Sequence, residues 1–175
     1  MGVVTAAAAV VDELARIAEP WRSAYSDSVA ISTAVLFTHL AALVVGAGLA
    51  LAADRATLRV WTAPPRDRAR HLGELALTHR PVVTALGVLF VSGSLLFLSD
   101  VENYATSAVF WTKMTLVTLL LANGFAMTRA EGALRRSGTE PNTEDTLWRR
   151  MRVLAMASVA LWMTTLLAGT ILASK

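Results

Sequence analysis

Four long stretches of the chain are almost entirely apolar, and polar connections separate them. The first, SVAISTAVLFTHLAALVVGAGLALAA, contains 25 consecutive residues without formal charge between Val29 and Ala53. At about 1.5 Å per residue, a helix of that length crosses a hydrocarbon layer of about 30 Å. A backbone in hydrocarbon must satisfy its own hydrogen bonds, so each stretch is predicted to be helical. The predicted spans are about 29–53, 81–99, 108–128 and 153–174.

The residues before the first span predict a further helix. Apolar residues recur on one side of residues 1–21, with charged residues opposite. This amphipathic helix is too polar to cross a membrane, so we expect it to lie in the outer interface, to end at Pro20 and to be anchored by Trp21. The chain then divides into an N-terminal periplasmic interfacial helix, 1–27, and a four-helix transmembrane domain, 28–175.

Proline positions also predict the helix ends in the first connection. Pro64 and Pro65 interrupt any helix that continues from the first span. A short amphipathic helix is expected around Arg68–Leu77. Pro81 suits the first turn of the second span, where its missing N–H costs nothing.

Basic residues are concentrated in two of the connections. Twelve of the sixteen Lys and Arg residues lie within 55–80 or 129–152. Because Lys and Arg accumulate on the cytoplasmic side of membrane proteins, these two connections are predicted to be cytoplasmic. The second connection and both termini are then periplasmic. Four spans with short links predict an all-α, up-down-up-down bundle.

Composition supports a membrane protein and excludes several other classes. The chain is 55% hydrophobic and only 17% charged, whereas soluble domains carry about a quarter charged residues. The isoelectric point near 9.9 follows from the basic connections, so no nucleic-acid partner is expected. The chain contains no cysteine, which excludes disulfides, thiolate metal sites and iron–sulfur clusters held by the protein.

Two segments carry a resemblance to a known family. The first is HLAALVVGAGLALAAD, with His39, Gly48 and Asp54, and the second is GSLLFLSDVENYATSAVFWTK, with Gly93, Phe97, Asp100, Tyr104, Phe110 and Lys113. Together they resemble an uncharacterised bacterial family of four-helix integral membrane proteins, a domain of unknown function. The resemblance extends from Leu14 to about Thr128. It implies the four-helix fold, a short helix before the first span and a location in the bacterial cytoplasmic (inner) membrane.

The chain departs from that family pattern at several positions. Asp54–Arg55–Ala56 replaces Asp-Leu-Arg, Ser107–Ala108 replaces Asn-Pro, and no His follows Asn123. More loosely, the architecture is similar to copper-resistance D-type proteins and cytochrome b561-like bundles. The family has no assigned activity, so the resemblance supports the fold far better than the function.

His39 is the ionisable residue nearest the middle of a span. It lies about 15 Å from the outer end of its helix, near the bilayer midplane. Polar residues in a membrane usually face the bundle interior, so the simplest interpretation is a neutral imidazole hydrogen-bonded to a neighbouring helix. Thr118 and Thr164 lie at a similar depth and are the expected partners.

The alternative role for His39 is axial ligation of a b-type haem. Met163 lies at nearly the same depth and is the second ligand of this hypothesis, whereas His79 lies about 21 Å nearer the cytoplasm. Gly46 or Gly48 would make room for the macrocycle.

The inner connections offer weaker candidates. His71 and His79, with Glu74 nearby, are interpreted as solvated interfacial histidines, with a metal site as the alternative. Asp54 is expected to pair with Arg55 or Arg59. No pair of buried carboxylates is predicted.

The second connection carries a separate group of polar and aromatic residues at the outer surface. Asp100, Glu102 and Lys113 are expected to form an interfacial ion pair, with the Lys113 ammonium reaching outward and Tyr104 and Trp111 as anchors. The alternative is an interaction site for a periplasmic partner or a metal.

Three functions from different classes remain open. The first is a non-enzymatic accessory or scaffold subunit that contacts partner proteins or other copies of itself within the lipid bilayer. The second is an electron-transfer protein that uses haem b. The third is a permease for a metal or small solute, for which four spans would need to oligomerise.

Overall fold

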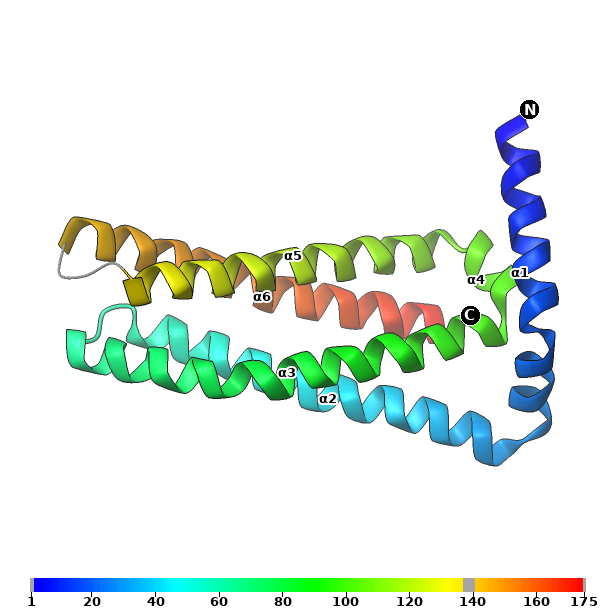
Figure 1. The fold of residues 1–175 in the computed structure, drawn as a ribbon, viewed down its shortest axis with the longest axis horizontal. Helices are drawn as coiled ribbons and strands as arrows, with labels where there is room; N and C mark the ends of the chain where they lie inside the picture. Colours follow the sequence, from blue (N-terminus) through cyan, green and yellow to red (C-terminus); the bar gives the residue numbers. More distant parts are fainter. Residues whose placement is uncertain (1, 137–140, 175) are drawn as a thin grey trace.

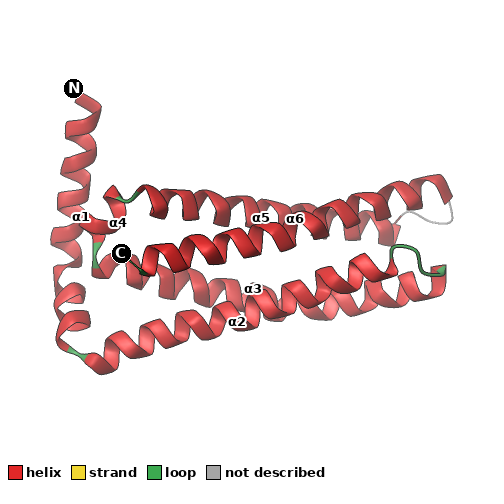
Figure 2. Cartoon of the chain, turned by 180° about the vertical axis from the view of Figure 1, so that it is seen from behind, coloured by secondary structure: helices red, strands yellow, loops and turns green. Residues whose placement is uncertain are grey.

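The computed structural model describes residues 2–136 and 141–174, and within them it consists of helices joined by short connections, with no strand. Four of the helices are long and apolar enough to cross a membrane. The structure thus confirms an all-helical protein with four candidate membrane-spanning helices (Figures 1 and 2). The helices are α1 Gly2–Asp27, α2 Val29–Val60, α3 Pro65–Ser99, α4 Val101–Thr106, α5 Ala108–Arg136 and α6 Pro141–Ala173.

Two prolines predicted to mark helix ends lie inside helices instead. Helix α1 continues through Pro20 to Asp27, and α3 runs as one helix from Pro65 through Pro81. The separate short helix and the break at Pro20 were therefore wrong. A proline removes one backbone hydrogen bond, and a long helix can keep its remaining bonds on both sides of that position. Pro65 does begin a helix, where no N–H is needed.

The long helices pack as two hairpins. Helix α2 packs along α3, α5 packs along α6, and the hairpins join mainly where α2 meets α6. Gly46 on α2 permits the first of these close approaches, because a Cβ there would lie 3.1 Å from the Cβ of Ala85 on α3. Helix α1 crosses one end of the hairpins and contacts α2, α3 and α4 (Figure 1).

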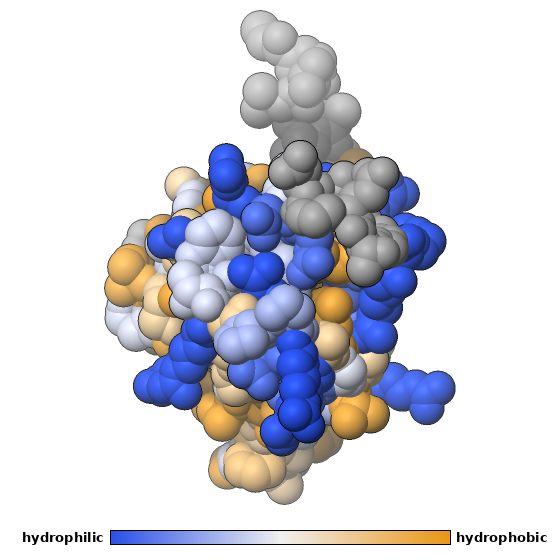
Figure 3. All heavy atoms as spheres, turned by 90° about the vertical axis from the view of Figure 1, so that its left-hand side faces the viewer, coloured by the Kyte–Doolittle hydropathy of each residue, from blue (hydrophilic) through white to orange (hydrophobic). Residues whose placement is uncertain are grey.

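The best-packed part of the molecule is the end opposite α1, which we call the basic end because residues 55–80, 129–136 and 144–152 meet there. In Figure 3 hydrophilic side chains gather on this end, with apolar side chains around its rim. Beneath them is a cluster of buried apolar residues from α3, α5 and α6: Leu75, Ala130, Leu134, Trp148 and Met151. The Arg68 guanidinium lies 5.6 Å from the Trp148 ring centroid, so a cation covers the aromatic core.

Elsewhere the long helices leave most of their apolar surface uncovered. In the most apolar 18 residues of each candidate span, between 6% and 28% of the residues are buried. Phe90 on α3, for example, is 76% exposed. Exposing such an apolar surface to water costs considerable free energy, whereas exposing it to hydrocarbon does not.

Candidate functional site

His39 lies at the contact between α2 and α3. Its Nδ1 atom is 3.0 Å from the hydroxyl oxygen of Ser92. The neighbouring Gly93 leaves space for the ring, because a Cβ at that position would be 3.4 Å from His39 Cε1. The imidazole therefore occupies a fixed place against α3.

The hydrogen bonds around Ser92 assign the histidine tautomer. The Ser92 hydroxyl donates its one proton to the Val88 carbonyl at 2.7 Å. Its oxygen must then accept from His39, so Nδ1 carries the hydrogen in this arrangement. This leaves the Nε2 lone pair of His39 unused by that bond.

The predicted partners of His39 were the wrong residues of the right chemical kind. Thr118 and Thr164 donate to carbonyl groups of their own helices, at 2.9 Å in each case. Ser92 lies on the next span along the chain, and consecutive helices joined by a short link usually pack together. That rule, added to the depth argument, would have favoured α3 over α5 and α6.

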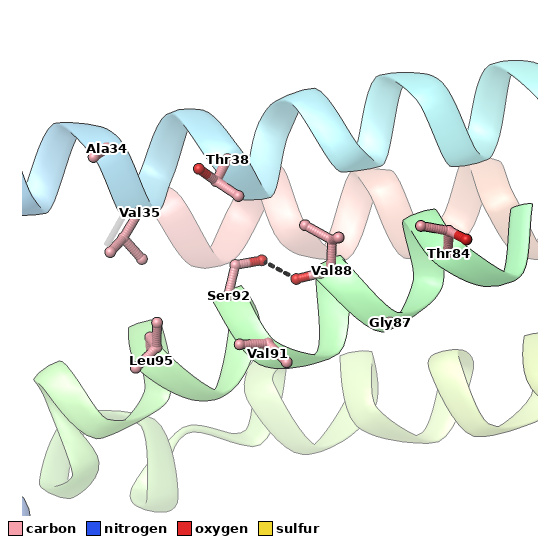
Figure 4. Close-up of a pocket in the computed structure, with 9 residues that line it drawn as sticks. All are labelled: Ala34, Val35, Thr38, Thr84, Gly87, Val88, Val91, Ser92 and Leu95. Carbon is pink, nitrogen blue, oxygen red and sulfur yellow. Dashed lines mark hydrogen bonds between the residues drawn. The ribbon is translucent and has the colours of Figure 1, made fainter. Parts of the chain in front are cut away.

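An apolar groove of about 500 Å³ lies between α2 and α3 beside this contact. Figure 4 shows Ala34, Val35 and Thr38 on α2 above the α3 side chains that complete the groove. Ser92 contributes to its wall, so the hydroxyl that holds His39 also borders the groove.

The other residues of the haem hypothesis, Met163, Gly46 and Gly48, differ in exposure and in the space beside them. Met163 on α6 is 47% exposed. The position of a Cβ on Gly46 is filled by Ala85, whereas no atom lies within 4 Å of a Cβ built at Gly48. Only Gly48 therefore leaves open space, and the His39–Met163 ligand pair stays a prediction.

At the basic end, His71 is buried rather than solvated. It is 4% exposed, and its Nε2 lies 2.9 Å from the Thr57 hydroxyl oxygen. Thr57 donates to the Ala53 carbonyl at 3.0 Å, so His71 is the donor to Thr57. The prediction of a solvated His71 was wrong because the segment around His71, predicted to be an interfacial connection, belongs to helix α3 and packs against α2.

The structure buries a carboxylate that the sequence did not indicate. Glu131 on α5 is 5% exposed and accepts hydrogen bonds from Arg135, at 2.7 Å from its terminal nitrogen. Arg135 also donates to the Leu72 carbonyl, and His79 Nε2 lies 3.2 Å from Glu131 Oε2. These contacts tie α5 to α3. The four-residue spacing of Glu131 and Arg135 was the available signal.

Asp54 is the second buried carboxylate, and its predicted partners were wrong. It accepts a hydrogen bond from Ser158 on α6 rather than pairing with Arg55 or Arg59. Its other oxygen, Oδ2, is buried without a hydrogen-bond partner among the described residues. Asp54 thus joins α2 to α6 where the two hairpins meet.

No three-residue group of His, Asp or Glu within the described ranges has an arrangement that would hold a metal ion. His71, His79 and Glu74 are therefore not gathered into such a group. Each histidine instead contacts a different helix neighbour, Thr57 for one and Glu131 for the other.

The end next to α1 is organised by aromatic rings. Phe97 stacks on Phe110 with centroids 5.2 Å apart, and Tyr104 packs against both rings. Trp111 is exposed and donates its indole N–H to the Ala105 carbonyl at 2.9 Å. The predicted anchors therefore share one end of the molecule.

The charged residues near these rings do not pair as expected. Asp100 lies between α3 and α4, and Glu102 is in the first turn of α4. Within the described part of the chain, no salt bridge joins either one to Lys113. The Lys113 ammonium instead lies against α6, 3.6 Å from where a Cβ of Gly169 would be.

The chain matches no protein-family model, no curated protein and no solved structure.

The half-buried Tyr104 phenol gives a prediction at high pH. Burial, together with the Asp100 carboxylate and the Tyr25 phenol, raises the pKa of Tyr104 above its ordinary value. Tyr25 and Tyr104 are the two tyrosines of the chain, so Tyr25→Phe leaves one phenol to titrate. We expect its ultraviolet absorbance to report ionisation at a higher pH than free tyrosine, for which the pKa is about 10.

The unfolded chain ionises first, so the stability contributed by the neutral phenol is complete below about pH 10 and is lost as the pH rises through the folded pKa. The same variant after denaturation is the control. Equal ionisation curves for the folded and denatured variant would contradict the structure.

Proposed function

We propose that the protein is a small multi-pass protein of the bacterial cytoplasmic membrane and a non-enzymatic accessory or scaffold subunit. The observation that carries this proposal is the uncovered apolar surface of its four long helices, which remains after the chain has packed. Lipid, partner helices or other copies of the chain would cover that surface. Polar contacts join helix to helix, as a structural subunit requires.

The proposed topology is an up-down-up-down bundle with the basic end in the cytoplasm. The two Arg-rich segments meet at that end, which agrees with the preference of basic residues for the cytoplasmic side. Helix α1 would then lie in the periplasmic interface. Val10 and Ile17 on α1 are exposed and would contact the acyl chains, while Trp21 donates to the Leu95 carbonyl at 2.9 Å and holds α1 to α3.

Single-cysteine labelling tests this topology directly, because the chain has no cysteine to remove. Thr62 lies between α2 and α3 and Asn103 lies in α4, and both are exposed. In spheroplasts, a membrane-impermeant maleimide should label Asn103→Cys and leave Thr62→Cys unlabelled. Both variants should react after permeabilisation. Labelling of Thr62→Cys in intact spheroplasts would reject the proposed orientation.

Photo-crosslinking in the native membrane tests the scaffold role. A photoreactive residue at Phe90, which is 76% exposed, should give a protein adduct of one defined mass, either a second copy or one partner. The same residue at Trp148, which is 1% exposed, is the matched interior control and should give no such adduct. Only lipid adducts from Phe90, Phe125 and Val44, with monomeric protein in mild detergent, would argue against a scaffold.

A haem b electron-transfer protein is the second candidate, and one observation favours it. Histidines that ligate a metal usually donate the other ring N–H to a fixed partner, and His39 donates Nδ1–H to Ser92 while Nε2 stays available. When bound, haem would supply one-electron transfer. Within this hypothesis His39 would hold the iron, Ser92 would orient the ring, and Met163 is the predicted second ligand.

A reduced-minus-oxidised absorption spectrum separates the two candidates. The electron-transfer function predicts a haem band that His39→Ala abolishes and that Met163→Leu shifts. Ser92→Ala should weaken haem retention, since the ring would lose its orienting partner. A colourless preparation from cells supplied with haem would remove this second candidate.

A further inference from the structure

A second groove lies between α2 and α3 at the basic end. Its volume is about 560 Å³, and its walls carry Arg55 and Arg59 from α2 and Arg70 from α3. The α2 wall also contains Ala52 and Ala56, whose short side chains leave space between the helices. The groove therefore combines an open, partly apolar floor with three guanidinium groups.

Two of these arginines have no acidic partner. Arg55 and Arg59 are exposed, and no salt bridge to either is found in the described ranges, 2–136 and 141–174. Their four-residue spacing places both on one side of α2. Asp54, their neighbour in sequence, is instead bonded to Ser158 inside the bundle. The two guanidinium groups are thus free to bind an anion together.

The position of the groove selects a lipid as the source of that anion. Arg55 follows the 25 uncharged residues that end at Ala53, so it lies where an apolar span reaches the membrane surface. That is the level of the phospholipid phosphates. A basic pocket between membrane helices on the cytoplasmic side is a common site for anionic head groups.

The remaining charges favour an anionic lipid over a zwitterionic one. The groove also contains Asp67 and Glu74, and Glu74 pairs with Arg70 at 3.1 Å. Three arginines and two carboxylates leave a net charge of +1, which a single phosphodiester charge neutralises. Hydroxyl groups on the head group would donate to the carboxylate of Asp67, whereas the trimethylammonium of phosphatidylcholine has no N–H or O–H to donate.

We propose that this groove binds the phosphodiester head group of an anionic phospholipid of the phosphatidylglycerol type. Arg55 and Arg59 contact the phosphate, and the acyl chains follow the apolar surface of α2 and α3 into the membrane. The site rests on the membrane placement proposed above and goes beyond it, because it assigns a specific ligand to one groove.

The test compares two double variants in detergent with added phosphatidylglycerol, read by native mass spectrometry. Arg55→Gln/Arg59→Gln removes two charges from the groove. Arg149→Gln/Arg150→Gln removes two exposed charges from α6 at the same end, outside the groove. At about 1 kcal/mol per arginine near an anionic lipid, the groove variant should bind about 30-fold more weakly. The α6 variant should bind like the wild type.

Several results would overturn the proposal. Equal weakening in both double variants would mean general attraction by the basic end. Equal binding of phosphatidylcholine by the wild type would mean that the groove does not recognise the charge. Displacement of the lipid by millimolar-range inorganic phosphate would mean a site for free phosphate.

Failure of this site is distinguishable from failure of the proposed topology. If Thr62→Cys and Asn103→Cys label as expected while lipid binding is unchanged in the groove variant, only the lipid site is wrong. Unchanged helical content and a single species in solution confirm that the groove variant folds, as expected for exposed arginines without acidic partners.

Discussion

The structure depends on the need of polar side chains on long apolar helices to find hydrogen-bond partners on neighbouring helices. Hydrocarbon offers no hydrogen bonds, so an unpaired imidazole or carboxylate on such a helix is costly. The chain meets this need by joining helices in pairs. His39 bonds to Ser92, His71 to Thr57 and Asp54 to Ser158. Each bond links two helices, so the polar residues also fix which helices are neighbours.

These contacts are unevenly distributed along the bundle. At the basic end, Glu131 and Arg135 join α5 to α3 above a core that contains Trp148 and Met151. Nearer α1, the hairpins rely on small residues such as Gly46 and Gly93, and on the aromatic rings at the outer surface. One end is therefore held by buried polar and aromatic contacts, while the apolar faces along the helices remain for lipid or for another protein.

The same uneven distribution separates structural charges from charges available for binding. The buried Glu131 carboxylate bonds to Arg135, whose side chain is partly exposed, and Arg68 covers Trp148. Arg55 and Arg59 form no salt bridge among the described residues, and both face a groove. A buried ion pair contributes to helix packing at a considerable desolvation cost, whereas an exposed, unpaired guanidinium costs little and remains free to meet an anion.

The sequence alone determined the four long apolar helices and the gathering of arginine in two connections, because hydropathy and charge are local properties of the chain. Each helix continues beyond its predicted span at the basic end, where the sequence predicted connections. It also singled out His39 and the outer aromatic residues. Only the tertiary structure decided which partners the polar residues have. His39 contacts Ser92, Asp54 accepts a hydrogen bond from Ser158, and Glu131 is buried. Depth along a helix can be counted from the sequence, but the direction in which a side chain points depends on how each helix is rotated against its neighbours. That rotation is set by packing between residues far apart in the chain.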